Sequence, residues 1–88
     1  MPDLAQSIRT CLQTLSPVSL ELQDESGQHV GHEGARSGGS HFRLKIVSGV
    51  FTGQSPIQRH RIIYAALGPL MQREIHALAI TAQAPDEI

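Results

Sequence analysis

The 88-residue sequence has few aromatic residues, a single cysteine and no excess of either charge. Phe42, Phe51 and Tyr64 are its whole aromatic set, so the core must be built mainly from aliphatic side chains. With Cys11 alone, the chain can form neither an internal disulfide bond nor an all-cysteine metal site. Seven basic against eight acidic residues give a net charge of −1. That balance argues against a protein whose main task is to neutralise phosphates.

Long apolar runs and a secretory signal pattern are also missing, so we expect a cytoplasmic protein with no membrane partner. The length fits a single domain over residues 1–88 with one modest core. No combination of nucleophile, base and orienting group is evident in the sequence. We therefore expect that the protein is not an enzyme.

The N-terminal segment predicts a helix that stops at Ser16, because Pro17 disfavours helical geometry in the residue before it. Asp3 can cap this helix, with Gln6 in the capping-box position. Apolar side chains then recur at helical spacing, at Leu4, Ile8, Cys11, Leu12 and Leu15. Since Cys11 lies on this stripe, a buried core thiol is a better interpretation than a ligand or nucleophile.

Two strands are expected next, over residues 18–23 and 41–48, because apolar and polar residues alternate in both. In the second strand, one side carries Phe42, Leu44 and Ile46, and the other carries His41, Arg43 and Lys45. Residues 25–40 lie between the strands and hold five of the eight glycines together with His29 and His32. A long glycine-rich connection of this type is often functional or flexible.

A second helix is predicted from Pro56, with Ser55 as N-cap and Gln58 completing a capping box, and Gly68 should end it. Five of its side chains are expected to face the core: Ile57, His60, Ile63, Tyr64 and Leu67. A short helix over residues 69–72 and a final strand over residues 75–82 follow. The polar tail, residues 84–88, is expected to fray.

The resulting order is α-β-β-α-α-β, an α+β fold in which a crossover of more than twenty residues joins the second and third strands. Such a crossover suits parallel strands. Parallel pairing would place His76, at the start of the third strand, near His41 and beneath the segment that carries His29 and His32. Imidazole is a common ligand of zinc, copper and iron. Solvated histidines that bind nothing remain the alternative, as does a mononuclear zinc site of His29, His32 and His41.

The run from Phe51 to Tyr64, which includes Arg59-His60-Arg61, is followed by His76-Ala77-Leu78 and resembles the signature of the BolA family. Further matches are Asp24-Glu25-Ser26, Ser40-His41-Phe42 and the tail from Ala84 to Glu87. This resemblance covers nearly the whole chain. It implies a class II KH-like, three-stranded mixed sheet with helices on one face and with the last strand parallel to the second.

BolA-like proteins pair with monothiol glutaredoxins, and the resemblance implies a shared [2Fe–2S] cluster that this chain would not bind alone. The glutaredoxin cysteine and glutathione would hold one side of the cluster, and His76 would be one ligand on the other. The second ligand would come from residues 25–40, with His29 as the best positional match and His32 as its rival; His41 lies nearby. Alone, the chain is expected to be a monomer or a weak homodimer.

The resemblance also implies an alternative function, because BolA-like proteins are described as DNA-binding transcriptional regulators with a role in stress responses. Candidate nucleic-acid contacts are Arg59, Arg61, Arg43 and Lys45. Residues 59 and 61 do not share a helix face, no aromatic stacking platform is evident, and the Gly-x-x-Gly loop of KH domains is missing. Charge on solvated faces explains these cations equally well.

Overall fold

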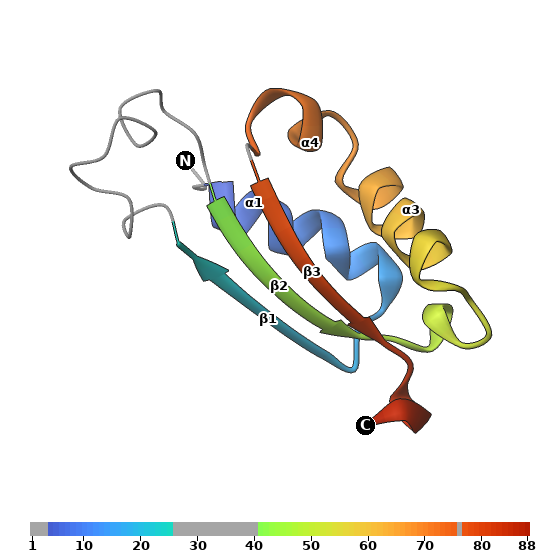
Figure 1. Ribbon diagram of the computed structural model, residues 1–88. Helices are drawn as coiled ribbons and strands as arrows, with labels where there is room; N and C mark the ends of the chain where they lie inside the picture. Colours follow the sequence, from blue (N-terminus) through green and yellow to red (C-terminus); the bar gives the residue numbers. More distant parts are fainter. Residues whose placement is uncertain (1–3, 26–40, 76) are drawn as a thin grey trace.

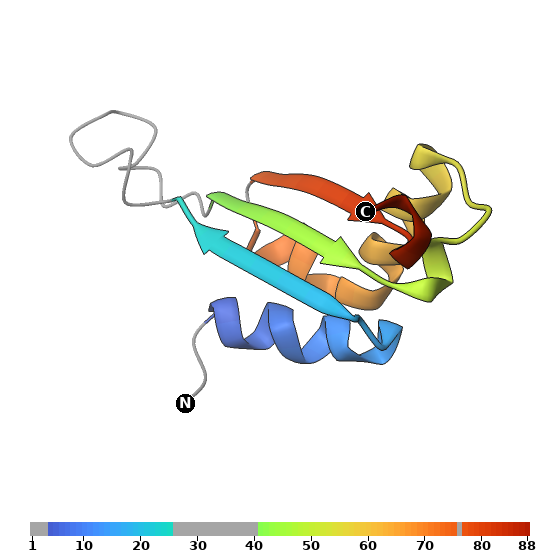
Figure 2. The ribbon, with the colours of Figure 1, turned by 90° about the horizontal axis from the view of Figure 1, so that it is seen from below.

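The computed structural model describes residues 4–25, 41–75 and 77–88. Its elements follow the predicted order (Figures 1 and 2). In chain order they are α1 (Leu4–Leu12), the 3-10 helix η1 (Gln13–Leu15), β1 (Ser19–Asp24), β2 (His41–Val47), η3 (Gly49–Phe51), α3 (Pro56–Leu67), α4 (Pro69–Arg73), β3 (Ala77–Gln83) and η4 (Pro85–Glu87). The α+β class is confirmed.

The three strands form one mixed sheet in the order β1-β2-β3. Strand β1 pairs antiparallel with β2, and β3 pairs parallel with β2, so that Ala77 lies opposite His41 and Gln83 opposite Val47. The predicted parallel return is therefore confirmed. Ile75, which was expected to open the third strand, does not belong to it, because its amide donates to Leu70 O over 2.9 Å and so continues the last turn of α4.

Helices α1 and α3 cover one face of the sheet, and Figure 2 shows them on the same side of the strands. The buried side chains of β2 are Phe42, Leu44 and Ile46, whereas Arg43 and Lys45 between them are exposed on the opposite face. The predicted alternation in this strand is confirmed. Burial of this apolar face is the main source of stability in a fold this small. Among the described residues, no helix is long and apolar enough to cross a membrane.

The core-facing side of α3 differs from the prediction. Ile63 and Leu67 are buried, but Ile57 is 66% exposed and Tyr64 is 41% exposed. His60 is half-buried, and its ring meets the edge of Tyr64 at a centroid distance of 6.2 Å. The helix is rotated so that Arg59, one turn before Ile63, points to the sheet, where it donates to Ala82 O. The helical spacing of the five predicted core residues does not show that Arg59 would take a place against the sheet, so the sequence could not predict which of them would be exposed.

The start of α3 matches the sequence prediction in detail. The amide of Gln58 donates to Ser55 Oγ over 3.2 Å, and the amide of Ser55 donates to Gln58 Oε1 over 2.8 Å. Pro56 occupies the first helical turn, and Gly68, with φ of 57°, follows the last residue. Glycine is the residue best suited to that backbone geometry. The predicted N-cap of α1, Asp3, lies outside the described residues.

Candidate functional site

One edge of the sheet gathers segments that are far apart in the sequence. Ala77 pairs with His41, and the amide of Glu25 donates to His41 O over 2.8 Å. Glu25 and His41 flank residues 26–40, and Ile75 and Ala77 flank residue 76. We call the edge defined by Glu25, His41, Ile75 and Ala77 the histidine edge. The parallel return of β3 is what brings its four residues together (Figure 1).

Most of the predicted ligands fall outside the described part of the chain. His29, His32 and His76 belong to residues 26–40 and 76, so the distances among these imidazoles stay a prediction. His41 is described and is half-buried at the start of β2. Within residues 4–25, 41–75 and 77–88, no group of three or more His, Cys, Asp or Glu side chains is arranged to hold a metal ion. The zinc alternative likewise depends on two histidines outside those ranges.

The single thiol of the chain lies in the helix layer. Cys11, the chain's one thiol, is half-buried on α1, whereas the sequence predicted a thiol buried in the core. It lines an apolar hollow of about 360 Å³ together with Leu67 and Leu70 in the helix layer. With this one cysteine, the chain cannot form an all-thiolate metal site by itself.

The cations of β2 lie on the open face of the sheet. Arg43, whose side chain is 64% exposed, donates from Nε to Glu25 Oε2 over 3.1 Å. Lys45 lies opposite Glu21 in the ladder. Both cations line a shallow hollow with Glu21 and Gln23. Their positive charge is thus offset by neighbouring carboxylates.

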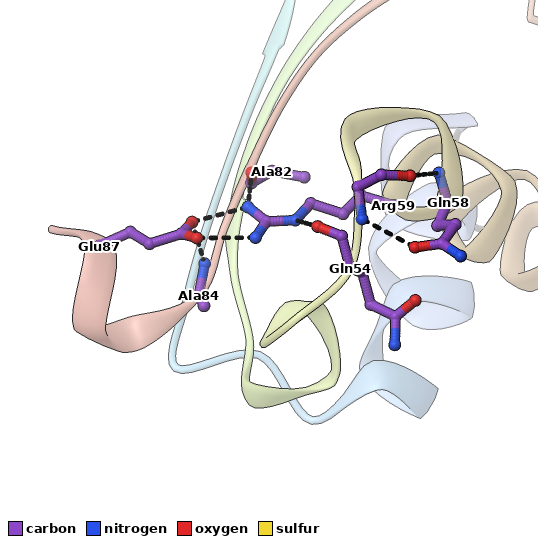
Figure 3. A network of polar contacts seen from close by, with 7 residues as sticks. Gln54, Gln58, Arg59, Ala82, Ala84 and Glu87 are labelled. Atoms are coloured by element: carbon purple, nitrogen blue, oxygen red, sulfur yellow. Dashed lines mark hydrogen bonds and ion pairs between the residues drawn. The ribbon is translucent and has the colours of Figure 1, made fainter.

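Arg59 forms a network with the C-terminal segment (Figure 3). Its Nε donates to Gln54 O over 2.9 Å and its Nη1 to Ala82 O over 3.0 Å. The two terminal nitrogens also donate to the two carboxylate oxygens of Glu87, over 2.6 and 2.7 Å. Glu87 Oε1 further accepts from the amide of Ala84 over 2.9 Å.

These contacts favour the charged form of both groups. The hydrogen bonds from Arg59, and then the one from the Ala84 amide, lower the pKa of Glu87 to about 2. The hydrogen bond to Glu87 raises the pKa of Arg59. The expectation that residues 84–88 fray was therefore wrong, because Glu87 of η4 is hydrogen-bonded to Arg59 of α3, which also binds Ala82 of β3. Glu87 lies 28 positions from Arg59, a separation that no helix or strand periodicity connects.

This network changes the status of Arg59 as a candidate contact to nucleic acid. Its guanidinium is a bidentate partner of a carboxylate and also binds two backbone carbonyls, so it fastens the fold. Arg61, by contrast, is exposed on α3. It belongs to the helix layer, whereas Arg43 and Lys45 belong to the open face of the sheet. The four predicted contacts therefore do not form one surface.

Comparison with known proteins agrees with the fold. The family model described as BolA-like protein matches residues 12–87. BolA-like protein 1 of Pongo abelii is 50% identical over 80 residues, which cover 90% of this chain and 56% of that protein. The DNA-binding transcriptional regulator BolA of Escherichia coli is 42% identical over 64 residues, 73% of this chain and 58% of that protein. The chain thus spans little more than half the length of these relatives.

A solved structure has the same fold as this chain. The BolA domain of SufE1 from Arabidopsis thaliana superposes with a TM-score of 0.83 at 42% identity, covering all of this chain and 99% of that domain. Its mixed three-stranded fold is the one described above. The resemblance inferred from the Arg-His-Arg and His-Ala-Leu segments is therefore confirmed: this chain belongs to the BolA-like protein family.

Proposed function

We propose that this chain pairs with a monothiol glutaredoxin and contributes two imidazoles to a [2Fe–2S] cluster that the two proteins share with glutathione. His76 would be one ligand and His29 the other, with His32 as its rival and His41 nearby. The observation that carries the proposal is the parallel ladder of β2 and β3. Had β3 run the other way, Ala77 would lie at the far end of the sheet from His41.

The histidine edge supports this proposal through the segments that it joins. The two neighbours of residue 76 are described: Ile75 is 5% exposed, and Ala77 pairs with His41 in the ladder. Residues 26–40 are flanked by Glu25 and His41, which are hydrogen-bonded to each other, and His41 pairs with Ala77. A ligand contributed by each segment would therefore start from anchored neighbours at one edge.

The chemistry of imidazole ligands fits an accessory role. A [2Fe–2S] cluster supplies one-electron chemistry when bound, and imidazoles in place of two thiolates raise its reduction potential. The imidazoles of this chain must be neutral to ligate, so binding weakens as pH falls through their titration range. Relatives support the broader assignment to iron–sulfur-related proteins, since a BolA domain is part of the SufE-like protein 1 of Arabidopsis thaliana.

Reconstitution tests the proposal. The protein is mixed with a monothiol glutaredoxin, iron, sulfide and glutathione, and the heterodimer is examined by absorption and electron paramagnetic resonance spectroscopy. We expect Rieske-like features that His76→Ala abolishes. His29→Ala should weaken them or leave a cluster on glutaredoxin alone.

Two further variants make the test specific. His32→Ala distinguishes the rival ligand, because only one of the two variants, His29→Ala or His32→Ala, should weaken the Rieske-like features. His60→Ala is the matched control, since this half-buried imidazole packs against Tyr64 on α3. If His76→Ala, His29→Ala and His32→Ala all kept the wild-type spectrum, the ligand assignment would be wrong.

A second candidate function is DNA binding, which the name of the Escherichia coli relative favours. Because Arg59 is engaged within the fold, Arg61 and Lys45 are the better residues to replace. A titration of duplex DNA across salt concentrations should show weaker binding and a shallower salt slope for each variant if they contact phosphates. Arg73→Ala, an exposed position at the end of α4, is the control. Unchanged slopes for Arg61→Ala and Lys45→Ala would remove both from the interface.

A further inference from the structure

The two outer strands of the sheet differ in the features that keep a further strand from pairing with them. Strand β1 has Glu21 and Asp24, whereas β3 contains no charged residue, no proline and no glycine. The ladder of β3 with β2 also runs from residue 77 to residue 83 without a bulge. Charges, prolines and bulges are the usual protection of an exposed edge. The residues of β3 itself therefore give its outer edge no protection.

The outer edge of β3 consists of the backbone groups of Leu78, Ile80 and Ala82. Gln83 O accepts from the amide of Ser48 on the β2 side, and the backbone groups of successive residues point to alternate sides of a strand. The helices lie against one face of the sheet (Figure 2), and a hollow of about 220 Å³ lies between the start of α3 and the end of β3. The helix therefore does not cover this edge by close packing.

One side chain of α3 does reach the edge (Figure 3). Arg59 donates from Nη1 to Ala82 O over 3.0 Å and from Nε to Gln54 O over 2.9 Å. The carboxylate of Glu87 accepts from both terminal nitrogens over 2.6 and 2.7 Å, so the guanidinium is fixed beside the strand. In the part of the chain that the structure describes, no other side chain is hydrogen-bonded to the backbone of β3. Arg59 therefore occupies space in which a neighbouring strand would have to lie.

The geometry of antiparallel pairing shows what this contact prevents. Two copies of β3 related by two-fold symmetry use the whole strand when Ile80 lies opposite Ile80 of the second copy. Leu78 of each copy then lies opposite Ala82 of the other, because both positions are equally far from Ile80. The Arg59 side chains block these two outer pairs and leave only the central one. That pair alone contributes little, because each hydrogen bond it forms replaces a hydrogen bond to water.

We propose that Arg59, held in place by Glu87, prevents the outer edge of β3 from pairing with the same edge of a second copy of this chain. A second copy is the strand that this edge would take, because two β3 strands bring no charged side chain toward each other, whereas β1 would bring Glu21 and Asp24. The contact thus keeps the domain monomeric as well as joining α3 to β3. This inference is independent of cluster binding, because it involves none of the candidate metal ligands.

Sedimentation equilibrium of the full chain tests the proposal. Wild type should sediment as a monomer, whereas Arg59→Met should form a dimer whose association is stronger by about tenfold or more, because the two outer pairs become available. Hydrogen exchange locates the contact. The amides of Leu78 and Ile80 should exchange more slowly as the concentration of Arg59→Met rises, and their exchange in wild type should not depend on concentration.

Two controls separate an accessible edge from a general loss of stability. Ser48→Ala removes two hydrogen bonds of a buried hydroxyl but leaves Arg59 in place, so this variant should be less stable and still monomeric. Adding Ala79→Lys to Arg59→Met should restore the monomer. Ala79 is exposed near the middle of β3, and the lysines of two copies would lie close together across the paired strands. Circular dichroism confirms that each variant is folded.

Several outcomes would overturn the proposal. A folded Arg59→Met that stays monomeric would do so, as would Ser48→Ala dimerising to the same extent. A dimer of Arg59→Met whose newly protected amides lie in β1, or one that Ala79→Lys fails to dissociate, would show that the association uses another surface. A wild-type dimer with protected amides at Leu78 and Ile80 would show that Arg59 does not block the edge.

Discussion

The sheet has an arginine–glutamate pair at each end, and the two pairs differ in geometry and burial. Arg43 and Glu25, at the histidine edge, share one hydrogen bond of 3.1 Å, and the arginine side chain is 64% exposed. Arg59 and Glu87, at the far end, share two bonds of 2.6 and 2.7 Å, and this arginine side chain is 12% exposed. Arg59 also binds two backbone carbonyls.

This difference indicates that the two ends of the sheet are not joined equally firmly. The far end, where β2 and β3 finish, is closed by the forked pair and by Ser48, whose Oγ donates to Leu15 O over 2.6 Å. The histidine edge is joined by one exposed pair and by ladder pairing. We infer that the contacts of the far end stabilise the fold more than the exposed pair at the histidine edge does. Four predictions examine this contrast.

Arg59→Met should have the largest effect on stability. It removes the forked pair and leaves the carbonyls of Gln54 and Ala82 without their partner, while methionine keeps most of the buried aliphatic volume. We expect the lowest midpoint in urea unfolding among the four variants, together with loss of protection of the Ala84 amide in hydrogen exchange. Arg59→Lys should recover only part of the loss, because lysine cannot form the fork. A midpoint equal to that of Arg43→Met would refute the contrast.

Ser48→Ala should have the next largest effect. Ser48 is 1% exposed, and its Oγ donates to Leu15 O and accepts from the amide of Val50. Alanine leaves these buried groups unsatisfied, at a cost of about 1–3 kcal/mol in the free energy of unfolding. Ser55→Ala, which removes an exposed N-cap, is the comparison and should cost about 1 kcal/mol. An equal loss in the free energy of unfolding for the two variants would show that the burial of Ser48 does not strengthen its hydrogen bonds.

Glu87→Gln should change the pH dependence of stability. The folded pKa of Glu87, about 2, lies below its ordinary value, so the folded state favours the carboxylate. Its contribution is full above the unfolded pKa and is lost as the pH falls toward 2. Wild type should therefore be more stable than Glu87→Gln at pH 6, and the two should converge near pH 2. Parallel unfolding curves between pH 6 and pH 2 would contradict the assignment.

Arg43→Met should have the smallest effect. Exposed single pairs contribute little, because solvent screens them and two long side chains must be ordered, so we expect a loss below about 0.5 kcal/mol. That loss should shrink further in 1 M salt. Equilibrium urea unfolding at low and high salt measures it. A loss comparable to that of Ser48→Ala would mean that the histidine edge is fastened as firmly as the far end.

Local patterns predicted the elements well. The capping box of Ser55 and Gln58 and the alternation of Phe42, Leu44 and Ile46 depend on residues close in sequence, and both are found as expected. The parallel return of β3 followed from the length of the crossover. The histidine edge could be predicted as a meeting of segments for the same reason, although His29, His32 and His76 lie outside the described residues.

Contacts between distant residues were missed. The orientation of α3 depends on Arg59, whose partners Ala82 and Glu87 lie 23 and 28 positions away. An arginine directed to the sheet displaced Ile57 and Tyr64 from the predicted core, and the same contact ordered a tail expected to fray. The periodicity of a sequence shows which side chains can share an apolar face, but it does not show which distant carboxylate will pair with an arginine on that helix.

The ladder between β2 and β3 joins residues 41 and 77, which are 36 positions apart. Such long-range pairing forms late, because closing a long segment of chain costs entropy before any contact compensates for it. A growing chain whose β3 is still inside the ribosome would already contain His29 and His32, but its histidine edge would not yet have formed. Capture of a metal cluster in the proposed manner would then report that synthesis and folding of the whole domain are complete.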